Sequence, residues 1–215
     1  MLDDVKRPYD SPQRREQATA TRMRIVQAAR TLLLQRGYAS TTMADVAAAA
    51  GVAVQTVYSA IGGGKAALAS QVWDITLAGD AENVPMSARP PFQAILDDPD
   101  PHGKLQRYAH VSREIYDRLG PVARVLRAGA AAGDADLQQL VETTEQQRLT
   151  GTALLARHLD ELGALRPGLS VEAAGHRLWA LNAPELADGL TLRCGWSLDE
   201  LEDWMADSMA HAVLR

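Results

Sequence analysis

Apolar residues recur at helical spacing along most of the chain, and the first clear face lies between positions 25 and 33. Its members stand at i, i+3, i+4, i+7 and i+8, which places them on one side of a helix: Ile25, Ala28, Ala29, Leu32 and Leu33. Gly37 follows and suits the left-handed conformation in which many helices end. The pattern therefore predicts a helix that stops near Arg36.

Two short helices are predicted after this long one. Thr42 and Asp45 have the spacing of a capping box, and a short apolar face follows at Met43, Val46, Ala47 and Ala50. Gly51 can end this helix in the left-handed conformation, and the next helix turns Val57 and Ile61 inward. Two short helices joined at a glycine and braced by a longer one predict a helix-turn-helix.

The rest of the chain also has a helical pattern. We expect a helix from Lys65 to about Ala78, a connecting loop over 79–102 because five prolines fall there, and helices near 103–119, 121–131, 134–163, 170–190 and 197–213. No run of strand length alternates, so the predicted fold class is all-α. The expected domains are a flexible basic tail (1–17), a helix-turn-helix domain (18–65) and a helical domain (66–215).

The last predicted helix has a continuous apolar seam. It consists of Leu198, Leu201, Trp204, Met205, Ser208, Met209, Ala212 and Val213, and Ser197 with Glu200 forms a capping box before it. A terminal helix this apolar needs a partner, which is either the rest of the chain or a second copy. The pattern leaves both open.

Composition narrows the class of protein. The 215 residues are 47% hydrophobic and 23% charged, as in ordinary globular proteins, and the apolar runs are too short to cross a membrane. The N-terminus lacks an apolar signal core, so we expect a cytoplasmic protein without a membrane partner. A single cysteine, Cys194, forms no internal disulfide and no cysteine-rich zinc site.

Charge is distributed unevenly. Residues 1–65 hold nine basic and five acidic side chains, a net charge of +4, which leaves −9 for the remainder of a chain whose total is −5. A basic N-terminal part on an acidic body suits nucleic-acid binding confined to one end.

The stretch from Gly62 to Lys65 has the residue types of a phosphate site. It is not a nucleotide loop, because the first glycine of a P-loop is missing, Ala66 follows the lysine, and a helix precedes it. A dinucleotide fingerprint fails too, since Ala67 stands at its last glycine. Backbone N–H groups and an ammonium at a helix start remain, and they suit a DNA phosphate. The preceding helix offers outward side chains for a major groove: Val54, Gln55, Thr56, Tyr58 and Ser59.

Catalytic patterns are missing from the sequence. H-E-x-x-H and G-x-S-x-G do not occur, the five histidines are scattered, and Glu172 with His176 is the nearest approach to a di-iron motif. We expect no enzyme, no metal and no cofactor. A helical protein-interaction module and a helical-bundle enzyme remain the alternatives to a DNA-binding protein.

Several segments in the first third of the chain carry the motifs of one family. They are residues 25–38 (IVQAARTLLLQRGY), Thr41-Thr42-Met43, Val46-Ala47, Ala50-Gly51-Val52, Thr56-Val57-Tyr58 and Lys65-Ala66-Ala67-Leu68. With these motifs the segment resembles the DNA-binding domain of the tetracycline-repressor (TetR) family. The resemblance implies base contacts from Val54, Gln55 and Thr56, and phosphate contacts from Thr42, Tyr58 and Lys65. The segment departs from the family pattern at Ala53 and Ile61, and it has a third glycine before Lys65.

A second resemblance lies near the C-terminus. Residues 178–185, 194–200 and 204–207 are similar to the last two helices of an actinobacterial-type subset of that family. In the family these helices build a homodimer, which implies interface residues Leu178, Leu181, Leu201, Trp204, Met205 and Met209. The resemblance further implies a small-molecule pocket, with Trp73, Tyr108, His110, Tyr116, Leu126 and Trp179 as candidates for its wall. The implied function is a regulator, usually a repressor, that a small molecule releases from a pseudo-palindromic DNA operator.

Overall fold

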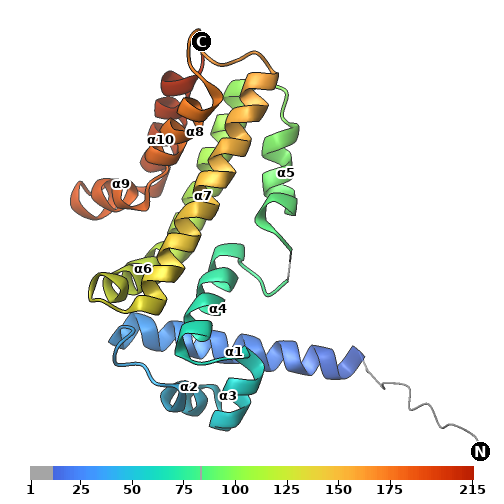
Figure 1. Cartoon of the computed structure of the whole chain (residues 1–215), viewed down its shortest axis with the longest axis vertical. Coiled ribbons are helices and arrows are strands. Elements are labelled where there is room, and N and C mark those ends of the chain that lie inside the picture. The colour runs from blue at the N-terminus through green and yellow to red at the C-terminus, as the bar shows by residue number, and fades with distance from the viewer. Residues whose placement is uncertain (1–11, 83) are drawn as a thin grey trace, which may run out of the picture. The chain divides into compact units, whose positions relative to one another are not determined.

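The computed structural model describes residues 12–82 and 84–215, and the secondary structure of this part of the chain consists of helices joined by turns and loops, with no strand (Figure 1). The all-α prediction is confirmed. The described residues divide into two compact units, one that ends at Ile75 and one that spans Thr76–Arg215. Most of the expected tail, residues 1–11, lies outside the described residues. The first helix of the chain begins at Pro12, so residues 12–17 belong to that helix and not to the tail.

The first unit is built from α1 (Pro12–Arg36), α2 (Met43–Ala50), α3 (Val54–Ile61) and most of α4 (Lys65–Ala78). The apolar face predicted for α1 is buried at Ile25, Ala29 and Leu33, and α1 packs against both α2 and α3. Val57 and Ile61 of α3 are buried as predicted. The predicted domain boundary after residue 65 falls at the start of α4, whereas the compact unit extends to Ile75.

The second unit continues with η1 (Met86–Ala88), α5 (Pro90–Asp97), α6 (Pro101–Ala131), α7 (Ala135–Glu161), α8 (Val171–Leu181), α9 (Pro184–Asp188), the π-helix η2 (Gly189–Arg193) and α10 (Leu198–Val213). The expected loop over 79–102 contains α5, because Pro90 stands in the first turn, where a helix needs no N–H donor. Two predicted helices merge into α6, which runs through Pro121 with Leu119, Val122 and Ala123 buried around it. Pro184 splits the helix predicted at 170–190.

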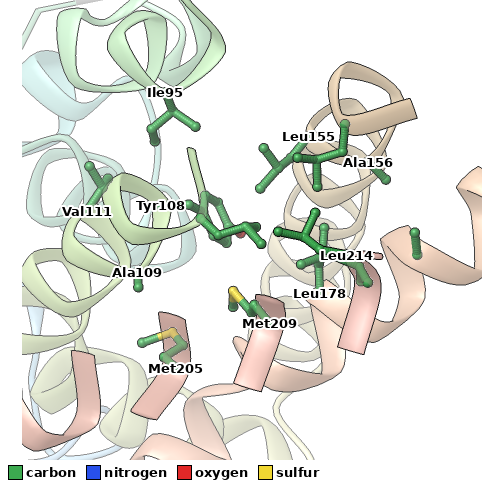
Figure 2. Packing of buried hydrophobic residues seen from close by; sticks show 14 of the residues in the cluster. Ile95, Tyr108, Ala109, Val111, Leu155, Ala156, Leu178, Met205, Met209 and Leu214 are labelled. Carbon is green, nitrogen blue, oxygen red and sulfur yellow. The ribbon is translucent and has the colours of Figure 1, made fainter. Parts of the chain in front are cut away.

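One apolar core holds the second unit together. Figure 2 shows Tyr108 of α6, Leu155 of α7, Leu178 of α8 and Met205 and Met209 of α10 converging in it. Leu201, Met205, Met209 and Val213 of the α10 seam therefore pack within their own chain, whereas Trp204 and Ala212 of the same seam are only partly buried.

A buried lysine joins two helices of this unit. Lys104 of α6 is 2% exposed, and its ammonium donates hydrogen bonds to the backbone oxygens of Ile95, at 3.0 Å, and Leu96 in the last turn of α5. Burial lowers the pKa of Lys104. Two of the carbonyl groups in the last turn of the short helix thus receive a donor from its neighbour.

Among the described residues, no single helix is both long enough and apolar enough to cross a membrane. Only α2 and α3 taken together reach that length and composition, and they are bent by 100° at their joint.

Candidate functional site

The start of α2 is fixed by a complete capping box. The Thr42 hydroxyl accepts a hydrogen bond from the Asp45 N–H at 3.1 Å, and the Asp45 carboxylate accepts one from the Thr42 N–H at 3.1 Å and one from its hydroxyl at 2.7 Å. These bonds, with the charge of Arg36 nearby, hold the pKa of Asp45 below its usual range. The predicted box is confirmed, and Thr42 itself is exposed at the helix start.

The turn between α2 and α3 depends on Gly51. This residue has φ 65° and ψ 39°, in the left-handed region that favours glycine, and its N–H bonds back to α2. The Val52 N–H also donates to the Ala47 oxygen at 3.0 Å. Across this turn the helix axis changes direction by 100°, within the range of helix-turn-helix motifs.

Helix α3 presents a mixed face to solvent. Val54 is 41% exposed and Tyr58 is 43% exposed, and the side chains of Gln55 and Ser59 are exposed as well. Thr56 is half-buried. The Ser59 hydroxyl donates to the Gln55 backbone oxygen at 2.9 Å, so this serine is partly engaged with its own helix. The exposed face combines an amide, a phenol and valine methyls, which are groups able to contact bases and phosphates.

Lys65 begins α4 and folds back over the preceding segment. Its ammonium donates to the Ala39 backbone oxygen at 3.1 Å and lies 4.2 Å from the centre of the Tyr38 ring. These contacts orient the charge of Lys65 toward the loop that precedes α2. They were not predicted, because no local pattern links the lysine to a loop 26 residues earlier.

The three glycines before Lys65 differ in what they require. Gly62 has φ 75° and caps α3. A Cβ atom on Gly63 would come within 2.8 Å of the Ala67 Cβ, whereas a Cβ on Gly64 would meet nothing within 4 Å. The extra glycine relative to the family pattern is thus accommodated by a close approach of the loop to the first turn of α4.

Gln71 fixes the joint between α3 and α4. Its amide nitrogen donates to the Ile61 backbone oxygen at 2.8 Å, and its amide oxygen accepts from Arg22 of α1 at 2.7 Å. One side chain therefore links three helices of the first unit. This link could not be predicted from the sequence, since a pair separated by 49 residues leaves no local signal.

The residues expected to line a small-molecule pocket have different environments. Trp73, Tyr108 and Leu126 are buried, and the Tyr108 hydroxyl accepts a hydrogen bond from the Asn182 amide at 2.9 Å. Burial raises the pKa of Tyr108. His110, in contrast, is exposed, with Nδ1 3.0 Å from the Glu202 carboxylate.

Tyr116 and Trp179, the other two candidates, take part in polar contacts. The Tyr116 hydroxyl lies 2.7 Å from Asp188 and 2.8 Å from the Thr191 hydroxyl, and burial is the main cause of its raised pKa. The Trp179 ring lies beneath the Arg148 guanidinium, at 4.5 Å from the ring centre.

A cavity of about 610 Å³ lies in the second unit. It is lined by Ala130 of α6, Trp179 of α8 and one side of α7: Gln138, Val141, Glu142, Glu145, Gln146 and Leu149. Of the six candidate wall residues, Trp179 alone reaches it. The other five are not brought together there.

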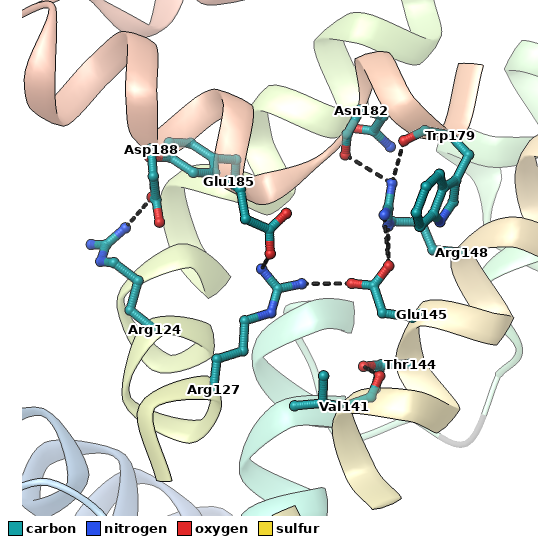
Figure 3. Close-up of polar contacts among 11 residues, drawn as sticks. Arg124, Arg127, Val141, Thr144, Glu145, Arg148, Trp179, Asn182, Glu185 and Asp188 are labelled. Atoms are coloured by element: carbon teal, nitrogen blue, oxygen red, sulfur yellow. Dashed lines mark hydrogen bonds and ion pairs between the residues drawn. The ribbon is translucent and has the colours of Figure 1, made fainter. Parts of the chain in front are cut away.

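A chain of ion pairs runs beside this cavity (Figure 3). Arg127 of α6 bonds to Glu145 of α7 at 2.6 Å and to Glu185 of α9 at 2.8 Å. Glu145 also bonds to Arg148 at 2.6 Å, and Arg148 donates to the backbone oxygen of Trp179 at 2.6 Å. These bonds tie the end of α8, where Pro184 interrupts the helical pattern, to α6 and α7.

The expected dimer-interface residues divide into two groups. Leu178, Leu201, Met205 and Met209 are buried in the core of their own chain, so they have no apolar surface left for a partner. This corrects their assignment to an interface. Leu181 and Trp204 are only partly buried, and the neighbouring Leu192 of η2 is 61% exposed.

Within residues 12–82 and 84–215, no three side chains of the metal-binding types gather in one place. The first unit instead combines a braced pair of short helices, a fixed 100° turn and an exposed mixed face on the second helix. This geometry defines the helix-turn-helix class of DNA-binding proteins.

The first unit matches the sequence model of a known protein family. Residues 25–72 match the model of the bacterial regulatory proteins of the tetR family. The chain thus carries a TetR-type DNA-binding domain, and the resemblance predicted from the sequence is confirmed. No curated protein gives a match.

Solved structures share the fold over nearly the whole chain. A complex of SmeT with triclosan has a TM-score of 0.72 at 19% identity and covers 91% of this chain and 92% of its own. NalD, the secondary repressor of the MexAB-OprM multidrug efflux pump in Pseudomonas aeruginosa, has a TM-score of 0.69 at 20% identity and covers 93% and 98%. A putative transcriptional regulator from Saccharomonospora viridis, in complex with choline, has a TM-score of 0.64 at 17% identity and covers 91% and 98%. At these identities the likeness concerns the fold.

Proposed function

We propose that this protein is a ligand-responsive transcriptional regulator that acts as a repressor and is released from a pseudo-palindromic operator by a small molecule. The observation that carries the proposal is the exposed face of α3, presented at a fixed angle by the capping box and by Gly51. Two of the similar structures hold a small molecule, triclosan or choline, and one is named as a repressor.

In this proposal α3 enters the major groove of double-stranded DNA. Gln55 pairs with a base through its amide, and the exposed methyl groups of Val54 contact thymine. Thr56 and Ser59 flank this contact. Thr42, Tyr58 and Lys65 bind phosphates on either side and position the helix without reading the sequence.

The regulator works as a homodimer, because two recognition helices are needed to bind both halves of a pseudo-palindrome. The partly exposed apolar side chains of α8, η2 and α10 suit the contact between copies: Leu181, Leu192 and Trp204. The second unit binds the effector. As a DNA-binding regulator, the protein acts in the cytoplasm.

The first test is selection of binding sites from a pool of random duplexes by the full-length protein, followed by affinity measurements on the selected site. We expect Gln55→Ala to weaken binding by about 1–3 kcal/mol per recognition helix and to relax one base preference. The exposed Gln147 of α7 offers a matched control, and Gln147→Ala should change nothing.

A salt series separates phosphate contacts from base contacts. Lys65→Ala should weaken binding to selected and to random DNA alike. The slope of log affinity against log salt concentration should fall by the equivalent of about one phosphate contact per protomer. Arg157→Ala, which removes the same charge from an exposed position of α7, controls for net charge. The proposal would be overturned, in favour of a helical interaction module, if no DNA sequence were selected. Equal salt slopes for the wild type, Lys65→Ala and Arg157→Ala would overturn it as well.

A further inference from the structure

The cavity beside α7 has an acidic and partly apolar wall. Glu142 and Glu145 stand among the residues that line it, and no basic side chain does. Glu145 is already paired with Arg127 and Arg148. Glu142 is exposed and has no ion-pair partner within residues 12–82 and 84–215. The cavity thus has one carboxylate whose charge nothing in the described chain compensates.

The same region already holds an organic cation of the protein itself. The Arg148 guanidinium lies 4.5 Å from the centre of the Trp179 ring and bonds to the Glu145 carboxylate at 2.6 Å. It also donates to the backbone oxygens of Trp179 and Asn182, at 2.6 and 3.2 Å (Figure 3). An aromatic ring, a carboxylate and carbonyl oxygens are the groups that stabilise organic cations in proteins.

The remaining wall is suited to the body of such a cation. Val141, Leu149 and Ala130 supply methyl groups, and the amides of Gln138 and Gln146 supply polar groups. The indole N–H of Trp179 is buried and has no hydrogen-bond partner. A buried donor left without an acceptor costs free energy. Since Trp179 lines the cavity, a shift of its ring that turned the N–H toward an oxygen on a bound molecule would relieve that cost.

We propose that this cavity binds a small organic cation, a quaternary or protonated amine that carries a hydroxyl or ether oxygen. Glu142 balances the positive charge, the apolar side chains enclose the carbon skeleton, and the Trp179 N–H donates to the oxygen. The role of this cation as the effector rests on the proposed regulatory function, whereas its binding does not.

Binding is therefore measured without DNA, by calorimetry on the full-length protein. Choline and 3,3-dimethylbutan-1-ol are the probes, because they have the same shape and hydroxyl and differ only in charge. We expect choline to bind at least about tenfold more tightly, and Glu142→Gln to weaken choline about two- to fivefold while leaving the alcohol unchanged. Glu172→Gln, the same change at an exposed position of α8 outside the cavity, should have no effect.

The role of the indole is tested with tetramethylammonium, which lacks the oxygen. Wild-type protein should prefer choline to tetramethylammonium, and Trp179→Phe, which keeps an aromatic ring but removes the N–H, should lose that preference. Equal affinity for choline and the neutral alcohol, or no loss of choline affinity in Glu142→Gln, would overturn the proposal. Hydrogen exchange of residues 138–146 tests whether a second copy of the chain covers the cavity instead. If rising protein concentration slows this exchange and choline does not, the proposal is overturned in favour of a second copy.

The regulatory role is examined separately, by adding choline to the complex with selected DNA. Release of the DNA would support the assignment of the cation as effector. Choline binding without DNA release would refute the effector role and leave the site intact, whereas failure to bind DNA at all would contradict the proposed function alone.

Discussion

The recognition helix α3 begins without a side-chain cap, and Ala53→Ser should supply one. Ala53 has φ −69° and ψ 149°, and no side-chain hydrogen bond caps the helix there. Ser170, which caps α8, has nearly the same backbone angles, −71° and 155°, and its hydroxyl accepts from the Ala173 N–H at 3.2 Å. A serine at position 53 therefore brings its hydroxyl close to the Thr56 N–H without any backbone movement. This N–H already donates to the Ala53 backbone oxygen at 2.9 Å, so the hydroxyl would share or replace an existing bond.

The expected gain is at most about 1 kcal/mol, the usual value of a serine cap over alanine, because the Thr56 N–H already has a backbone acceptor. Since each 1.4 kcal/mol is tenfold in an equilibrium constant, the opening of α3 should become rarer by up to about fivefold. Hydrogen exchange of the backbone amides in residues 54–61 measures this opening directly, because exchange slows in proportion to the population of the open form. The affinity for DNA should rise with it, as α3 is then better ordered before binding.

Two variants serve as controls. Ala53→Val adds carbon atoms at the same exposed position but no acceptor, so it should not slow exchange in α3. Thr42→Ala removes the existing cap of α2 and should accelerate exchange in residues 43–50 by a similar factor. If Ala53→Ser and Ala53→Val protect α3 equally, the missing cap is not what limits the stability of this helix.

Two further predictions concern the glycines before α4 and the ion pair after it. Gly63→Ala should destabilise the first unit by about 1–3 kcal/mol in thermal unfolding, because its Cβ would lie 2.8 Å from the Ala67 Cβ, whereas Gly64→Ala should be tolerated; equal effects would contradict the packing argument. Hydrogen bonds from Arg89 hold the pKa of Asp80 below its unfolded value of 3.8, so the pair stabilises the fold above that value and loses its effect as the pH falls through the folded-state pKa. Asp80→Asn should therefore lower the urea midpoint at pH 7, and its difference from wild type should shrink as the pH falls below 3.8; a difference that stays constant over that range would count against this account.

The helix-turn-helix could be predicted from the sequence because its determinants are local. Thr42 and Asp45 are three residues apart, Gly51 is the one residue at its turn free to adopt a positive φ, and Val57 with Ile61 marks the buried side of α3. Each signal involves residues within one or two turns of each other. Such short-range chemistry fixes an element before any tertiary contact is known.

The second unit was less predictable because long-range contacts decide its details. The bond from Arg148 to the Trp179 oxygen joins residues 31 positions apart, and it supports a helix end that the pattern extended to residue 190. Likewise, the seam of α10 gave no indication whether Met205 would face its own core or a second copy. Apolar periodicity identifies a buried face but not the surface that covers it.

The dependence of α5 on Lys104 has a consequence for the order of folding. An eight-residue helix is too short to persist alone in water, and this one obtains the donors for its final carbonyl groups from α6. Residues 90–97 can therefore become helical only once the first turns of α6 have formed. In refolding experiments α5 should acquire its structure late, and mutations within it should change the unfolding rate more than the folding rate.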